Sequence, residues 1–334
     1  MKETDLPEPG VSRIRKGRDS MISYYKTALD GTLRPIEQPA RGCWVCVVEP
    51  DEAEKDYLLN TLHVQPEFIR ASLDEEESSY IDHSDDQKQT LVIVDYPERE
   101  DSPRQNVDSW ITMPVGVIFL DGMLVTISAH HNSTIDALIS GKVRKLDTHY
   151  KTRFLLQVIL LISQEYLMAL RQINRMSNQT EQKLYQKMSN ESLIDMLTLD
   201  KSLIYFSTSL KAEQQTLQRI LRSKQIPMYE QDKELLDDVL IEVNQAIEMC
   251  EIYLDISSRT QDGFSNVINN NMNIIMKRLT VITLVLSIPN MVYGFYGMNV
   301  TGLPWPVAWV PLLISVSVCL AAWLYFRHSS GYRS

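Results

Sequence analysis

A row of mostly polar or small side chains runs through otherwise apolar sequence near the end of the 334-residue chain. Its members are spaced alternately four and three residues apart: Asp262, Asn266, Asn269, Asn273, Met276, Thr280, Thr283, Ser287, Asn290, Gly294 and Gly297. A repeat of about 3.5 residues places them all on one side of a helix, and helices that associate along such a repeat form a left-handed supercoil. Carboxylate, amide and hydroxyl oxygens along this polar row predict the wall of a water-filled pore.

Two uncharged segments predict a membrane-spanning helical hairpin. The first, residues 279–298, would be about 30 Å long as a helix, which is enough to cross a bilayer. The second covers residues 305–326, and the short outer loop 299–304 joins the two. Because an unsatisfied polar group that faces lipid is costly, the polar row should face water or a partner helix. Ordinary helix packing, with Ser and Thr bonded to their own backbone, is the alternative explanation.

The distribution of charge predicts the orientation in the membrane. Lys277 and Arg278 precede the first span, Arg327, His328 and Arg333 follow the second, and the outer loop has no charge. Both termini are therefore expected in the cytoplasm, in a multi-pass protein of the cell (inner or plasma) membrane. The N-terminal 20 residues are polar and charged and contain no signal-peptide core. A net charge of −10 argues against nucleic acid as a partner and suits the attraction of cations.

The first 132 residues predict a cytoplasmic α/β domain. Strand-like runs alternate there with two helical segments, and Asp30-Gly31 and Asp121-Gly122 mark tight turns between strands. Cys43 and Cys46 form a C-x-x-C pair, but the surrounding residues are typical of a buried strand and supply no second ligand pair for zinc. We therefore interpret both cysteines as packing residues.

The segment 133–278 predicts a helical and stalk region. Ser133 or Thr134 is expected to cap a short helix, and two longer helices are expected over about 148–187 and 190–223. A last helix is expected from about 233 to 297, which at 1.5 Å per residue is about 97 Å long. It would form a stalk continuous with the first membrane span, and residues 327–334 would form a cytoplasmic tail.

The end of the first span carries a short signature. Tyr296-Gly297-Met298-Asn299 resembles the Gly-Met-Asn motif of the CorA family of divalent-cation channels, chiefly magnesium transporters. The order of an α/β domain, a helical region, one long stalk helix and two C-terminal spans resembles that family over almost the whole chain. The resemblance implies a CorA-like homopentameric funnel in the lipid bilayer, with Gly297, Met298 and Asn299 as the selectivity filter. An asparagine ring can hydrogen-bond the tightly held water shell of magnesium.

The resemblance also implies a gate and a regulatory metal site. Met276 and Leu279 correspond to the apolar inner gate, whereas Ser287 stands where the family has a further bulky residue. Asp238, beside Asp237, corresponds to the stalk member of the site where intracellular magnesium closes the channel. Its family partner position is Ala71 here, so the acidic run that begins with Asp74 and Glu75 is the candidate replacement, and a solvated loop is the alternative.

Three functions remain open from the sequence. The first is a magnesium channel, for which cobalt, nickel and zinc are further candidate ions. The second is a zinc transporter like ZntB; Met298 favours magnesium, because the zinc branch of the family tends to carry valine there. The third is a non-transporting, membrane-anchored sensor or scaffold. An enzyme is not expected, because the sequence contains no phosphate-binding loop, metal-hydrolase histidine pair or nucleophile motif.

Overall fold

The computed structural model describes residues 22–84, 88–100, 107–141, 143, 146–187, 189–223, 226–298, 302, 307 and 309–328. The chain divides into two compact units, Met1–Ser257 and Ser258–Ser334, and helix α6 (Glu230–Tyr296) contributes to both. The sheet and helices α1 to α5 lie in the first unit, and helix α7 (Trp309–His328) lies in the second. The boundaries expected at residues 132 and 278 remain predictions.

The described part of the first unit contains a seven-stranded sheet in the order β2-β1-β3-β7-β6-β5-β4. The strands are β1 (Ile22–Thr27), β2 (Leu33–Ile36), β3 (Trp44–Val48), β4 (Tyr80–Ser84), β5 (Gln89–Glu100), β6 (Ser109–Leu120) and β7 (Met123–Ser128). Neighbours are antiparallel except for β3 and β7. Leu120 pairs with Met123 across the expected two-residue turn, where Gly122 has a φ of 75°. The edge strand β4 was not expected from its short, mostly polar sequence.

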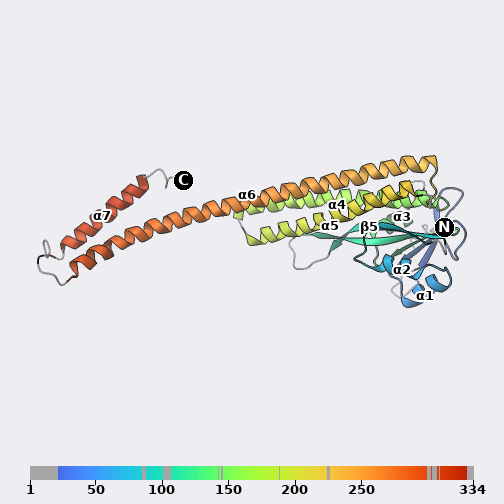
Figure 1. The fold of residues 1–334 in the computed structure, drawn as a ribbon, viewed down its shortest axis with the longest axis horizontal. Helices are drawn as coiled ribbons and strands as arrows, with labels where there is room; N and C mark the ends of the chain where they lie inside the picture. The colour runs from blue at the N-terminus through green and yellow to red at the C-terminus, as the bar shows by residue number, and fades with distance from the viewer. Residues whose placement is uncertain are drawn as a thin grey trace, which may run out of the picture. The chain divides into compact units, whose positions relative to one another are not determined.

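Helices cover both faces of the sheet (Figure 1). On one face lie α1 (Glu52–Asn60) and α2 (Pro66–Leu73), and on the other lie α4 (Lys151–Lys187) and α5 (Asn190–Arg222). Cys43 belongs to the hydrophobic cluster of the first face and Cys46 to that of the second, because residues three apart on a strand point to opposite sides. Both thiols are free and buried, and burial raises the pKa of Cys46 to about 12. The packing interpretation of the C-x-x-C pair is confirmed.

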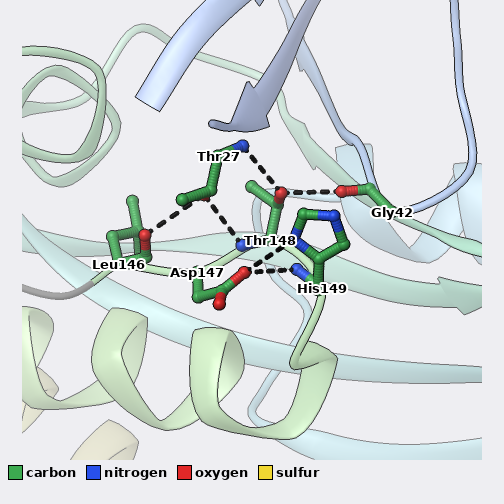
Figure 2. A network of polar contacts seen from close by, with 6 residues as sticks. All are labelled: Thr27, Gly42, Leu146, Asp147, Thr148 and His149. Atoms are coloured by element: carbon green, nitrogen blue, oxygen red, sulfur yellow. Dashed lines mark hydrogen bonds and ion pairs between the residues drawn. The ribbon is translucent and has the colours of Figure 1, made fainter. Parts of the chain in front are cut away.

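A buried polar network fixes the start of α4 against the sheet (Figure 2). The backbone N–H groups of Thr27 and Thr148 each donate to the other's hydroxyl oxygen, both at 3.1 Å. The Thr148 hydroxyl donates in turn to the Gly42 carbonyl at 2.6 Å, and the Thr27 hydroxyl donates to the Leu146 carbonyl at 3.2 Å. Because Thr148 joins strand β1 and the loop before β3 in this way, α4 begins at Lys151 rather than at Thr148.

The cap of the short helix α3 (Ser133–Ile139) differs from the expected one. Asn132 is the N-cap, and its side chain accepts a hydrogen bond from the Ile135 backbone N–H at 2.8 Å. The hydroxyls of Ser133 and Thr134 instead donate to the carboxylate of Glu165 on α4, at 3.0 and 2.8 Å. The prediction of Ser133 or Thr134 as the cap is therefore wrong, because a tertiary acceptor takes both hydroxyls.

Helix α6 is continuous over 67 residues and includes Pro289, as the sequence predicted for a stalk joined to the first span. Among the described residues, three helices are long and apolar enough to cross a membrane: Lys151–Tyr185, Glu230–Tyr296 and Trp309–Phe326. The most apolar window of the first is 61% buried inside the protein, against 0% for α6 and 11% for α7. The apolar face of α4 therefore serves the core beside the sheet, while α6 and α7 remain the candidate spans.

Candidate functional site

One side of the apolar part of α6 packs against α7. The Cys319 thiol on α7 donates to the Val285 carbonyl oxygen at 3.5 Å, and Val285 and Pro289 line a mainly apolar pocket together with α7 side chains. Val281, Ile288 and Val292 are also half-buried and share this side of the helix. This set defines the α7-facing side of α6.

The polar row lies on the opposite side of α6. A helix turns by about 100° per residue, so Thr283, Ser287 and Gly294 lie about 145° to 175° round the axis from the centre of the α7-facing side. All members of the row from Asp262 to Gly297 are exposed on the single chain. Because α7 covers the other side, the polar row is left for water or for other copies of the chain. The structure thus separates the two faces that the sequence alone could not assign.

The hydroxyl groups of the row donate to their own helix backbone. Thr280 donates to the Met276 carbonyl and Thr283 to the Leu279 carbonyl, each at 2.8 Å, and Ser287 donates to the Leu284 carbonyl at 2.8 Å. A hydroxyl has one hydrogen to donate and two lone pairs, so its outward surface is then an acceptor. This back-bonding was the alternative explanation of the row, and it also leaves oxygen acceptors directed away from the helix.

The amide and carboxylate members extend this surface towards the stalk. Asn290 follows the last of the hydroxyls, and the remaining ones precede them on α6: Asp262, Asn266, Asn269 and Asn273. Met276 and Leu279, the candidate gate residues, are 53% and 55% exposed and separate the amide part from the hydroxyl part. Oxygen ligands are those that magnesium and its water shell prefer.

The signature follows directly after the last residue of α6. The Gly297 N–H donates to the Tyr293 carbonyl at 2.9 Å, and the Met298 N–H donates to the Phe295 carbonyl at 3.4 Å. A Cβ on Gly297 would lie 3.1 Å from the Tyr293 oxygen, which is closer than ordinary contact. Gly297 therefore allows the backbone to close tightly over the end of α6. Asn299 lies outside the described residues.

The candidate regulatory carboxylates are separate in the chain and exposed. Asp237 and Asp238 lie on the exposed side of α6, and Asp74 and Glu75 follow α2. Glu75 Oε1 lies 2.8 Å from His130 Nε2, a contact that the sequence did not reveal. Among the residues that the structure describes, no three His, Cys, Asp or Glu side chains come together in a group that could hold a metal ion.

Comparison with known proteins finds a matching family and a similar protein over most of the chain. A family model described as CorA-like Mg2+ transporter protein matches residues 39–328. The cobalt/magnesium transport protein CorA of Methanocaldococcus jannaschii is 27% identical over 331 residues, which cover 93% of this chain and 100% of that protein.

Two solved structures share the fold. The complete structure of the CorA magnesium transporter from Methanocaldococcus jannaschii has a TM-score of 0.81 at 22% identity, and the match covers 94% of this chain and 99% of that one. The ZntB cytoplasmic domain from Vibrio parahaemolyticus has a TM-score of 0.59 at 12% identity over 75% of this chain and all of that domain. Because the family model spans most of the sequence, this chain belongs to the family of CorA-like Mg2+ transporter proteins.

Proposed function

We propose that this protein forms a homopentameric pore that conducts divalent cations, chiefly magnesium, through the cell membrane. The observation that carries the proposal is the placement of the polar row opposite the α7-facing side of α6. In an assembly with α6 on the inside and α7 on the outside, the row faces the axis and the apolar sides meet lipid. Both chain termini then lie in the cytoplasm, as the flanking charges predict.

Selection in this pore would act on a hydrated ion. Magnesium gives up its water reluctantly, so a ring of five Asn299 amides at the outer mouth would hydrogen-bond the water shell without removing it. Gly297 and Met298 would set the position of that ring at the end of α6. The outward oxygens of Asn290, Ser287 and the row threonines would then accept hydrogen bonds from the ion's water along the pore.

Closure would occur where the row becomes apolar. Rings of Met276 and Leu279 would exclude water from the narrow part of the pore and so stop conduction. Asp262, nearer the cytoplasmic end of α6, would provide a ring of carboxylates that concentrates cations. Intracellular magnesium at Asp238 and Asp237 of one subunit, with Asp74 or Glu75 of its neighbour, would favour the closed state.

Zinc transport is the second candidate, because this chain shares its fold with the ZntB cytoplasmic domain over 75% of its length. The fold alone does not discriminate between the ions. The relative from Methanocaldococcus jannaschii is named for cobalt and magnesium, which supports these two, and nickel is a further candidate on the same chemical grounds.

Ion flux into liposomes that contain the purified full-length protein tests the proposal. Magnesium, cobalt, nickel and zinc are compared with and without a membrane potential and with and without a proton gradient. Magnesium entry driven by the potential supports the channel. Zinc flux that requires a proton gradient supports the second candidate, and the absence of flux for every ion leaves a sensor or scaffold.

A further inference from the structure

Helix α6 carries a proline in its apolar part, between Ser287 and Asn290 of the polar row. Pro289 lies inside the helix, four residues after Val285. A proline has no backbone N–H, so the Val285 carbonyl loses the donor that a helix normally supplies from four residues further on. The proline ring also crowds that carbonyl and tends to bend the helix there. Val285 therefore has a backbone acceptor that needs a donor from outside α6.

The missing donor comes from α7. The Cys319 thiol donates to the Val285 carbonyl at 3.5 Å, so it reaches the carbonyl that Pro289 leaves without its helical donor. Where lipid replaces water, a freed backbone group finds its partner within the protein, and neighbouring helices are a usual source. Cys319 is a free, half-buried thiol and so has a hydrogen to donate. The match between the two positions makes this contact specific to the proline.

The packing beside the proline increases the importance of this hydrogen bond. A mainly apolar hollow of about 470 Å³ lies beside Val285 and Pro289, and its wall on α7 includes Ser315, Cys319 and Trp323. Such a hollow removes part of the dispersion contact that otherwise holds two helices together. The thiol thus joins α7 to α6 at a point where apolar packing alone is incomplete.

The polar row passes the same turn of α6 on its other side. Ser287 precedes the proline and donates to the Leu284 carbonyl at 2.8 Å, and Asn290 follows the proline directly. A bend at Pro289 therefore changes where the Asn290 amide lies relative to the Ser287 hydroxyl. The direction of the row at this level depends on what holds the proline turn.

We propose that Cys319 is a positioning residue: its thiol replaces the backbone donor that Pro289 lacks and fixes α7 to this turn of α6. In this way it sets where Asn290 stands relative to Ser287. Loss of the thiol leaves a carbonyl unsatisfied among apolar side chains, and the turn then adopts other bends. The effect on ion flux rests on the proposed pore, whereas the hydrogen bond itself does not.

A double-mutant cycle tests whether the thiol is needed because of the proline. Pro289→Ala restores an N–H at position 289, so the Val285 carbonyl again accepts from its own helix. An unsatisfied buried acceptor shifts an equilibrium by about 5-fold to 150-fold, so Cys319→Ala should lower magnesium flux into liposomes at least about fivefold. In the Pro289→Ala background the same substitution should change the flux by less than about twofold.

Two variants of α7 serve as controls, with flux normalised to the amount of assembled protein. Cys319→Ser keeps a hydrogen-bond donor at the same position and should keep the flux within about twofold of the wild type. Ser315→Ala changes a residue that is 4% exposed and lines the same hollow, but it leaves the thiol in place. Its flux should also stay within about twofold of the wild type.

Infrared spectroscopy of the S–H stretch gives a readout that needs no transport. The band moves to lower frequency when the thiol donates, and the difference between the wild type and Cys319→Ala separates this cysteine from the other three. The Cys319 band should lie at lower frequency in the wild type than in Pro289→Ala, where the spectrum of the double variant is subtracted in the same way.

Either of two results would overturn the proposal. One is an equal effect of Cys319→Ala on flux in the wild-type and Pro289→Ala backgrounds, including no effect in both. The other is an S–H band at the same frequency in the wild type and in Pro289→Ala. If the wild type conducts no ion at all, the pore proposal fails, and the infrared comparison alone decides whether the thiol replaces the missing donor.

Discussion

Replacement of Asn290 by leucine should close the pore to hydrated ions while keeping the helix. The two side chains have similar size, but leucine offers no hydrogen bond, and in a pentamer the change removes five amides from one level of the polar row. A net hydrogen bond is worth about 0.5–1.5 kcal/mol, so five of them correspond to at least about 2.5 kcal/mol for an ion passing that level. Because 1.36 kcal/mol is a factor of ten in rate, magnesium flux should fall at least about 70-fold.

The assay is magnesium entry into liposomes at a fixed potential, normalised to the amount of assembled protein by size-exclusion chromatography. Met291→Leu is the matched control, because Met291 is 77% exposed, lies on the next position of α6 and is apolar before and after the change. Its flux should stay within about twofold of the wild type, since no hydrogen bond is removed. Equal flux in Asn290→Leu and the wild type, with the oligomer intact, would refute the reasoning.

Three further predictions concern the outer mouth of the pore, the regulation of the pore by magnesium and the stability of the fold. Asn299→Ala should abolish selective magnesium uptake without dissociating the oligomer, and flux and size-exclusion measurements together check this. Unchanged selectivity for magnesium in this variant would rule out the asparagine ring as the selectivity filter. Asp238→Ala should leave flux higher than the wild type when magnesium inside is high, and an unaltered magnesium inhibition curve would place the sensor elsewhere. Thr148→Val should lower the free energy of unfolding by about 2–4 kcal/mol, because it leaves the buried Thr27 N–H and Gly42 carbonyl without partners. Thr208→Val is the control, since its exposed hydroxyl only donates to the Ile204 carbonyl on its own helix; equal urea-unfolding curves for the two variants would contradict this account.

Most of the architecture followed from local patterns. The Asp121-Gly122 turn, the opposite faces of Cys43 and Cys46, and the unbroken helix through Pro289 were all predicted from spacing. The features that were missed depend on contacts between distant segments. Asn132 caps α3 because Glu165, on another helix, takes the neighbouring hydroxyls, and the five-residue strand β4 forms only by pairing with β5.

The candidate site also combines a feature that local spacing predicts with one that depends on a contact between distant segments. Spacing was enough to find the polar row, but only the contact between Val285 and Cys319 shows which side of α6 the second apolar helix covers.

The central claim is that the polar row lines a water-filled pore, and cysteine accessibility along α6 tests it most directly. Single cysteines are introduced at successive positions from 280 to 294 in a background that lacks Cys319, and the inhibition of magnesium flux by a charged thiol reagent is measured. Positions 280, 283, 287, 290 and 294 should react and lose flux, whereas positions 281, 285, 288 and 292 on the α7-facing side should not. Reaction and block confined to the α7-facing positions, or no difference between the two sides, would contradict the account.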